Sequence, residues 1–254
     1  MLKDERATTI HKDETVTSQE RVLMILKVIA QFGRPASAGD LMKATGLAKS
    51  TLYRQLAILR RWGFVLETGN LYAPGPVSLQ LALGFDGTTL LAQCAQEDMQ
   101  WLSEQSQETV AISVAMQRQA ICISMIEATQ SLRCSFEKGR SVPLRAGATA
   151  RCLLAHMPEQ ERNHALAQAF PQPEARDAVL RQLTAIRQQG YACSDSEVDA
   201  GIWGVSFPLL TRDRRLLGVL SLMAPSQRVA ERQTALIALT AQSAERIHHR
   251  LKDF

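Results

Sequence analysis

The chain has 254 residues and a net charge of +4. This length is typical of about two domains and allows a buried core without disulfide cross-links. The sequence has no run of eighteen apolar residues and no apolar leader at its N-terminus, so neither a membrane span nor a secretory signal is expected.

The positive charge is concentrated in the first third of the chain. Residues 1–75 contain eleven Lys and Arg against seven Asp and Glu, an excess that equals the net charge of the whole chain. The remaining residues carry equal numbers of acids and bases. A cationic N-terminal segment followed by a neutral remainder is expected of a chain whose N-terminal part binds a polyanion such as nucleic acid.

Cysteine usage favours a reducing compartment. The five cysteines are odd in number and form no Cys-x-x-Cys pair. This pattern suits buried thiols in the cytoplasm better than a disulfide framework.

The N-terminal residues divide into an arm and a helix. Residues 1–17 alternate acids and bases with few large apolar groups, which predicts a disordered arm. From Ser18 to Phe32, apolar residues recur at helical spacing and predict an amphipathic helix. We expect it to be the first helix of a domain spanning residues 18–80, with apolar surface left over for a dimer contact.

Residues 37–72 contain the pattern around which the chain is organised. Ser37 precedes a short helix expected over Ala38–Thr45, which a glycine ends. A second helix is expected to start near Ala48 or Lys49 and to end at about Trp62. Two short strand patterns on either side of Gly69-Asn70 then predict a hairpin. This order is typical of a winged helix-turn-helix, whose second helix enters the DNA major groove.

Short polar and cationic side chains lie in the first turns of that second helix, mostly off its buried stripe. Such side chains suit base edges and phosphates. A small helical pair with a solvated polar face is the alternative that the two helices alone leave open. The candidate DNA-binding residues are Arg21, Lys49, Ser50, Thr51, Tyr53, Arg54 and Asn70.

The rest of the chain mixes strand and helix patterns. A helical stretch over residues 81–106 is interpreted as a linker helix, and residues 107–254 as a second domain. Strands are expected over Thr109–Met116, Ala120–Glu127, Arg133–Phe136, Ile202–Leu210 and Leu216–Met223. Helices are expected over Ala148–Met157, Glu159–Ala169, Ala178–Gln189 and Glu231–Leu251. Without strict strand–helix alternation, this mixture predicts an α+β fold on a mainly antiparallel sheet.

Three polar sets in the second domain are candidates for a binding site. Small residues over 145–149 start a helix, and its N-terminal amides favour an anion such as a carboxylate. Ser194 and Asp195 lie ahead of a glycine. Ser221 and Met223 alternate on one strand face. Each set alone is also explained by a helix cap, a turn or core packing.

Taken together, these segments resemble the IclR family of bacterial transcriptional regulators. The first domain carries ERVLMIL, LMKATGLAKSTLYRQLAIL and a GFV–Y wing, and the second carries VPLRAGATARCLLA, QQGYACSDSEVDAGIWGVSFPLL and LLGVLSLMAP. The resemblance covers nearly everything from Ser18 onward. It implies a winged helix-turn-helix domain, a linker helix and a GAF-like α+β effector-binding domain. It also implies dimers or tetramers on palindromic operators in double-stranded DNA, responding to small organic acids or aromatic catabolites.

The resemblance also places residues. It puts the recognition helix at Lys49–Arg54. Regulators of small keto acids tend to have Asp, Cys and Ser where this chain has Ser194, Gly204 and Met223, and a Gly-Lys pair where it has Ala150-Arg151. We therefore expect a larger or less polar effector, such as an aromatic carboxylic acid, rather than glyoxylate or pyruvate. The candidate effector-binding residues are Val142, Gly147, Ala148, Thr149, Ser194, Asp195, Gly204, Ser221 and Met223.

Alternative functions were weighed on the same residues. Cys152 and His156 share one face of a helix and could form a nucleophile pair or half a metal site. No further ligand has recognisable spacing, and no hydrolase, metalloprotease, phosphate-loop or dinucleotide motif occurs. We expect no catalytic activity, no metal and no cofactor. A cysteine-based redox sensor and a DNA-binding adaptor without a ligand remain as alternatives.

Overall fold

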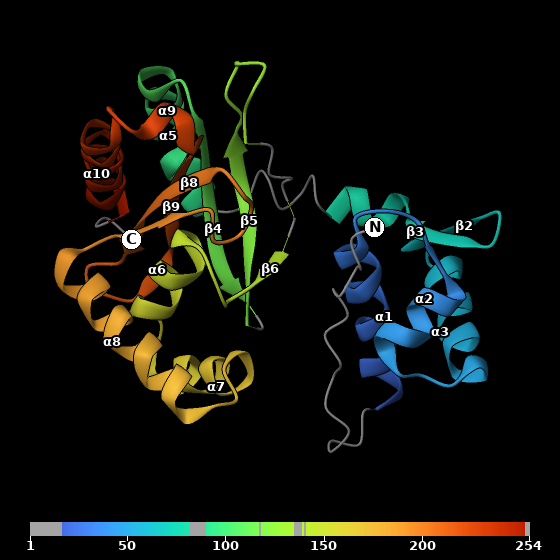
Figure 1. Cartoon of the computed structure of the whole chain (residues 1–254). Helices are drawn as coiled ribbons and strands as arrows, with labels where there is room; N and C mark the ends of the chain where they lie inside the picture. Colours follow the sequence, from blue (N-terminus) through green and yellow to red (C-terminus); the bar gives the residue numbers. More distant parts are fainter. Residues whose placement is uncertain (1–16, 82–89, 117, 135–138, 140, 252–254) are drawn as a thin grey trace. The chain divides into compact units, whose positions relative to one another are not determined.

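The structure is a computed structural model that describes residues 17–81, 90–116, 118–134, 139 and 141–251 (Figure 1). The chain divides into two compact units, and the division lies within residues 82–89, which are not described. Each unit has its own hydrophobic core. The arm expected over residues 1–17 lies outside the described residues, apart from Thr17. Among the described helices, none combines the length and apolar character that crossing a bilayer requires.

The first unit is a three-helix domain with a small antiparallel sheet. Its elements are α1 (Ser18–Phe32), β1 (Ala36–Ser37), α2 (Ala38–Thr45), α3 (Lys49–Arg61), β2 (Val65–Thr68) and β3 (Leu71–Pro74). Capping boxes define the starts of α1 and α2. The hydroxyls of Thr17 and Ser37 each accept from the backbone amide three residues later, and the carboxylate of that later residue accepts from the amide of Thr17 or Ser37. Both helices have the bounds that the sequence predicts.

The core of the first unit forms where the sequence predicts it. Leu52, Leu56 and Leu59 of α3 are buried against α1, as their helical spacing predicts. Strand order is β1-β3-β2, and the two residues of the hairpin turn, Gly69 and Asn70, both have positive φ. Strand β1, which pairs with β3, was not predicted from the sequence. This arrangement confirms the helix-turn-helix with a wing.

The second unit is built on a six-stranded sheet of order β6-β5-β4-β9-β8-β7, in which every neighbouring pair is antiparallel. This confirms the predicted α+β fold. Its strands are β4 (Thr109–Met116), β5 (Gln119–Ile126), β6 (Ser141–Pro143), β7 (Ala192–Asp195), β8 (Ile202–Leu210) and β9 (Leu216–Pro225). Its helices are α5 (Leu90–Ser106), α6 (Ala148–His156), α7 (Glu159–Ala169), α8 (Pro173–Gln189), α9 (Ser226–Val229) and α10 (Gln233–Leu251).

Alternation along the central strands gives the sheet two different faces. On β9, Leu220 and Leu222 belong to the core cluster that α5 and α10 cover, whereas Val219 belongs to the cluster formed with α6, α7 and α8. Side chains point to opposite faces at every second residue, so one strand serves both layers. Figure 1 shows α10 and α6 on opposite sides of the sheet.

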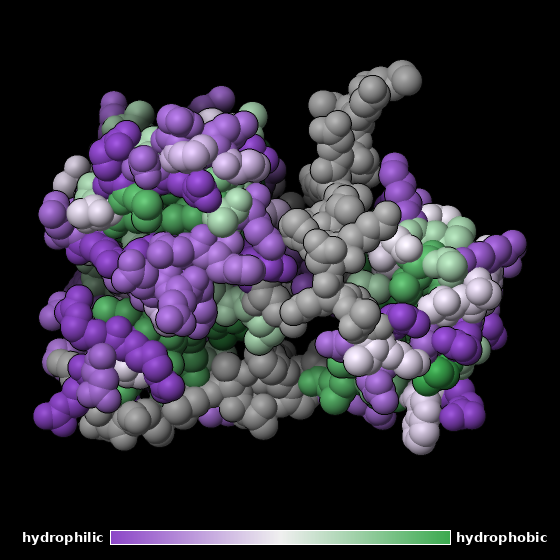
Figure 2. Space-filling model, turned by 90° about the horizontal axis from the view of Figure 1, so that it is seen from below, coloured by the Kyte–Doolittle hydropathy of each residue, from purple (hydrophilic) through white to green (hydrophobic). Residues whose placement is uncertain are grey.

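The outer helices α7 and α8 cover the second cluster with a few apolar residues. Leu166 of α7 and Leu183 and Ile186 of α8 are buried there, and most of their other side chains are exposed or half-buried. Figure 2 views the molecule from the side on which these helices lie in Figure 1, and hydrophilic residues predominate on that part of the surface.

Several sequence predictions for the second unit need correction. The helix expected as a linker over residues 81–106 is observed from Leu90 as α5, and its buried residues Leu91, Met99 and Leu102 pack in the core of the second unit. Residues 82–89 are outside the described part. No strand includes Arg133 or Cys134, and the rest of the strand expected there, residues 135 and 136, lies outside the described residues. Strand β6 was not predicted. Helix α8 begins at Pro173 rather than Ala178, and β7 was missed.

A buried ion pair ties α9 to the start of β4. The Glu108 carboxylate has no exposed surface and accepts from Nε and Nη2 of Arg228 at 2.8 and 2.5 Å. The same guanidinium donates to the carbonyl of Leu132 at 2.7 Å. One planar guanidinium thus bonds both carboxylate oxygens, which offsets the cost of burying the charge.

Replacement of Arg228 by Met should destabilise the second unit strongly, because the Glu108 carboxylate is then buried without its main counter-charge. We expect a loss of about 3–5 kcal/mol in the free energy of unfolding, measured by urea denaturation. Arg133→Met is the matched control, since Arg133 pairs with Glu127 at a half-exposed site, and its loss should stay under about 1 kcal/mol. Equal losses in the two variants would contradict this assignment.

Candidate functional site

A cavity of about 360 Å³ lies between the start of α6 and the sheet face that α6 covers. Strands β4, β8 and β9 present several small or hydroxyl side chains to it, whereas many of their larger apolar residues belong to the core cluster that α5 and α10 cover. The lining residues on these strands are Ala111, Ser113, Ile202, Gly204, Ser206, Leu222 and Met223. The walls are therefore mainly apolar, with hydroxyl groups at a few positions.

Three hydroxyl groups connect α6 to the sheet beside this cavity. The Oγ1 atom of Thr149 lies 2.9 Å from Oγ of Ser221 and 3.4 Å from Oγ of Ser206, and the two serine oxygens are 2.7 Å apart. Ser206 and Ser221 are almost completely buried. Buried hydroxyls need partners, and here each finds them within the cluster. The hydroxyl cluster Thr149–Ser206–Ser221 thus fixes where α6 begins.

Two side chains, one from β7 and one from the segment between β7 and β8, cap α6. The Gly147 amide donates to Oε2 of Glu197 at 3.0 Å, and the Ala148 amide donates to Oγ of Ser194 at 2.9 Å. Arg151, one turn into α6, forms an ion pair with the same Glu197 oxygen at 3.0 Å. The N-terminal amides that the sequence analysis assigned to a ligand carboxylate are therefore partly occupied by the chain itself.

Gly147 has a backbone conformation that other residues rarely adopt. Its φ of 89° and ψ of 157° lie in a region almost restricted to glycine. A Cβ atom at this position would lie 2.6 Å from Cγ2 of Val198, which lines the cavity. The absence of a side chain therefore allows the β7–β8 segment to approach the start of α6.

The structure brings most of the predicted effector residues to this cavity. Asp195 does not line it, because its exposed carboxylate accepts from the hydroxyls of Ser226 and Ser196, which lower its pKa. Ser221 does not line it either and lies in the hydroxyl cluster instead. The predicted residues that line the cavity are Val142, Gly147, Ala148, Thr149, Ser194, Gly204 and Met223.

Sequence reasoning missed several residues of the site. Ser113 and Ser206 line the cavity, and each is a hydroxyl residue within an otherwise apolar strand, the same signal that singled out Ser221. Glu197 was not among the candidate effector-binding residues. Its contact with Gly147 spans fifty residues, so no local pattern predicts it.

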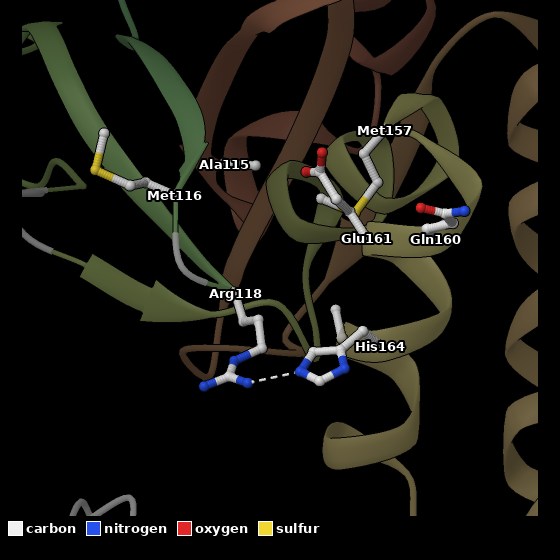
Figure 3. A pocket seen from close by; sticks show the side chains of 8 residues that line it. Ala115, Met116, Arg118, Met157, Gln160, Glu161 and His164 are labelled. Atoms are coloured by element: carbon white, nitrogen blue, oxygen red, sulfur yellow. Dashed lines mark hydrogen bonds between the residues drawn. The ribbon is translucent and has the colours of Figure 1, made fainter. Parts of the chain in front are cut away.

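A second hollow of about 360 Å³ lies between the β4–β5 turn and α7, and it contains none of the predicted site residues (Figure 3). Arg118 and His164 point toward each other there, and the guanidinium donates to Nε2 of the imidazole at 2.9 Å. Met116, on its wall, is 55% exposed. Because its polar residues are exposed, this hollow is a weaker candidate than the cavity beneath α6.

Three thiols of the second unit are poorly placed for redox chemistry. Burial raises the pKa of Cys134 and of Cys193 to about 11 and raises the pKa of the fully buried Cys152 further. A thiol needs its thiolate form to react. His156 contacts the carbonyl of Cys152, and burial lowers its pKa. Within the described ranges, no group of three or more His, Cys, Asp or Glu is arranged to hold a metal ion.

The first unit presents a polar face at the start of α3. Lys49, Ser50, Tyr53 and Arg54 are exposed, and Thr51 is half-buried. Asn70 is exposed at the tip of the β2–β3 hairpin, and Arg21 is half-buried on α1. Helix α3 has no side-chain cap, since Ala48 precedes it, in contrast to α1 and α2. Its first amides and these side chains are therefore available to an anionic partner.

Comparison with protein families gives two matches that together cover both units. Residues 18–69 match the IclR helix-turn-helix domain, and residues 87–249 match the C-terminal domain of the bacterial transcriptional regulator IclR.

Individual proteins agree with these matches. The chain is 26% identical to the HTH-type transcriptional regulator XynR of Escherichia coli, over 87% of this chain and 90% of the relative. It is 26% identical to the acetate operon repressor of Salmonella typhimurium, over 95% and 92% of the two chains. The crystal structure of the IclR transcriptional regulator from Alicyclobacillus acidocaldarius has a TM-score of 0.78 at 21% identity, over 93% of this chain and 99% of that one.

Gly147→Ala should destabilise the second unit by about 1–3 kcal/mol, because alanine is strained at this φ and its Cβ meets Val198. Chemical denaturation measures the loss. Gly204→Ala is the matched control from the same cavity, since its Cβ would have only ordinary contacts of 3.7–3.9 Å, and it should change stability by less than about 1 kcal/mol. A Gly147 variant as stable as the Gly204 variant would refute the strain argument.

Proposed function

The chain belongs to the IclR family of bacterial transcriptional regulators, and we propose that its second unit binds a small organic acid beneath α6 and thereby changes operator binding by the first unit. The observation that carries this proposal is the cavity itself. It is mainly apolar, has hydroxyl groups at a few positions and two charged residues, Arg133 and Asp199, in its lining, and lies at a helix N-terminus. These properties are typical of small-molecule sites.

The polar groups at the cavity suit an acid with a further hydrogen-bonding group. In the described part of the chain, no acceptor bonds the amides of Thr149 and Ala150, and both residues line the cavity. Such amides at the start of a helix favour a negative charge. The hydroxyls of Thr149 and Ser206 can bond a second polar group of the ligand.

The size of the cavity favours a ligand larger than a three-carbon keto acid. At roughly 30 Å³ for each water-sized group, 360 Å³ accommodates about twelve such groups. Gly204 and Ala148 leave room where larger side chains would fill the space. A ring-containing acid uses this volume and contacts the apolar wall formed by Val142, Ile202 and Met223.

For the first unit, we propose the major-groove docking of winged helix-turn-helix proteins. Two copies of the chain, as a dimer or within a tetramer, would place their α3 helices in successive major grooves of a palindromic operator, roughly 34 Å apart. The ligand would act only through its different affinities for the DNA-competent and incompetent states. A cytoplasmic location remains a prediction.

A ligand-free adaptor and a cysteine-based sensor remain the alternatives. The adaptor requires a packed second unit, and the cavity beneath α6 argues against it. The sensor requires an accessible thiolate, and the raised pKa values of Cys134, Cys152 and Cys193 argue against these three thiols.

A thermal-shift screen tests the ligand class. Aromatic acids such as benzoate and phenylacetate should raise the melting temperature of the whole chain, because binding to the native state alone stabilises it by about 2.7 kcal/mol at one hundred times Kd. Gly204→Leu should abolish the shift by filling the cavity, whereas Gly204→Ala should retain it. Stronger stabilisation by pyruvate or glyoxylate would contradict the proposed size. A response to none of these acids would favour the adaptor.

Two substitutions on α3 separate base readout from phosphate contact. With an operator selected from random duplex DNA, Arg54→Ala should cost about 1–3 kcal/mol and cost less on unrelated DNA. Lys49→Ala should weaken both alike and reduce the salt slope by about 1. Arg61→Ala, at the exposed far end of α3, is the control in a fluorescence anisotropy titration. An unchanged ratio of specific to unspecific affinity in the Arg54 variant would show that Arg54 reads no base.

A further inference from the structure

The start of α6 already holds a carboxylate that belongs to the chain. One oxygen of Glu197 accepts from the Gly147 amide and forms an ion pair with Arg151, both at 3.0 Å. The Glu197 and Arg151 side chains are each 27% exposed, so both contacts are partly shielded from water. An amide at a helix N-terminus together with a guanidinium is a favourable environment for any carboxylate.

This internal carboxylate lies beside the ligand cavity. Gly147, which donates to Glu197, lines the cavity, and so does Val198, the next residue after Glu197. The amides of Thr149 and Ala150, which we assign to a ligand carboxylate, follow Gly147 within the first turn of α6. A ligand carboxylate bound there would approach the charge of Glu197. Two carboxylates that share one site repel each other.

The β7–β8 segment that carries Glu197 is anchored independently of it. Asp195 accepts from the hydroxyl of Ser226 at 2.6 Å, and the Ser196 amide donates to the carbonyl of Ile202 at 2.8 Å. The Gly201 carbonyl accepts from the Ser226 amide at 2.8 Å. The base of the segment therefore keeps its contacts when Glu197 leaves α6.

We propose that Glu197 is a specificity-determining residue, an internal competitor whose carboxylate holds the Gly147 amide and Arg151 beside the Thr149 and Ala150 amides, and that an acidic ligand must displace. This inference rests on the proposed ligand site. It makes the wild-type cavity bind an acid more weakly than the same cavity would without the Glu197 carboxylate, and it leaves the affinity for uncharged molecules of the same shape unchanged. It also couples the binding of an acid to release of the β7–β8 segment from Gly147 and Arg151.

Chemical rescue tests the occupancy. In the full chain with Glu197→Ala, sodium acetate should raise the melting temperature by about 2–4 °C, because acetate fills the vacated position. Acetamide and sodium chloride at equal concentration should not. The wild-type chain and Glu197→Gln, whose side chain still fills the position, should show no difference between acetate and acetamide. The same response of Glu197→Ala to acetate and acetamide would overturn the proposal.

Ligand selectivity gives a second readout. Calorimetric titration of Glu197→Ala should show at least a tenfold tighter Kd for benzoate than the wild type, with the Kd of benzamide changed by less than about threefold. Glu159→Gln, which removes an exposed carboxylate paired with Arg162, is the control and should change neither. Unchanged or weaker benzoate binding in Glu197→Ala would contradict the competition. Failure of the proposed function would give a different result from failure of the Glu197 proposal, because operator binding would then not change with any ligand.

Discussion

The contact between the start of α6 and strands β8 and β9 is the constraint on which the candidate site depends. The hydroxyl cluster of Thr149, Ser206 and Ser221 sets the position of the helix. Small residues beside it, such as Gly204 and Ala148, leave the space unfilled. Larger side chains here would close the cavity, and apolar ones in place of the hydroxyls would remove groups that can orient the ligand.

The two units use helix N-termini in different ways. In the first unit, α1 and α2 satisfy their amides with capping boxes, and α3 has no side-chain cap and presents exposed polar residues instead. In the second unit, α6 borrows Glu197 and Ser194 from a distant segment. The local caps of α1 and α2 stabilise the first unit itself. The uncapped start of α3 and the borrowed cap of α6 lie where we place the two partners, DNA and the ligand.

Local signals predicted much of the fold, and long-range contacts were what the sequence could not show. Helices α1 and α2 have their predicted bounds because the boxes at Thr17 and Ser37 and the glycines after them are adjacent in sequence. The short strands β1, β6 and β7 were missed, since only their pairing partners define them. For the site, the helix start at 147–149 was predicted from its small residues. Its occupation by Glu197 was not, because the two residues are fifty positions apart.

Reciprocal linkage between the two units tests the central claim most directly. The acid that stabilises the chain most would be titrated calorimetrically into the free protein and into the protein saturated with its operator. If the ligand changes operator affinity, the two ligand dissociation constants must differ by the same factor, commonly about 5–150-fold. The account predicts this equality of factors. Equal ligand affinity for the free and the DNA-bound chain would contradict it, because a ligand indifferent to the two states shifts nothing.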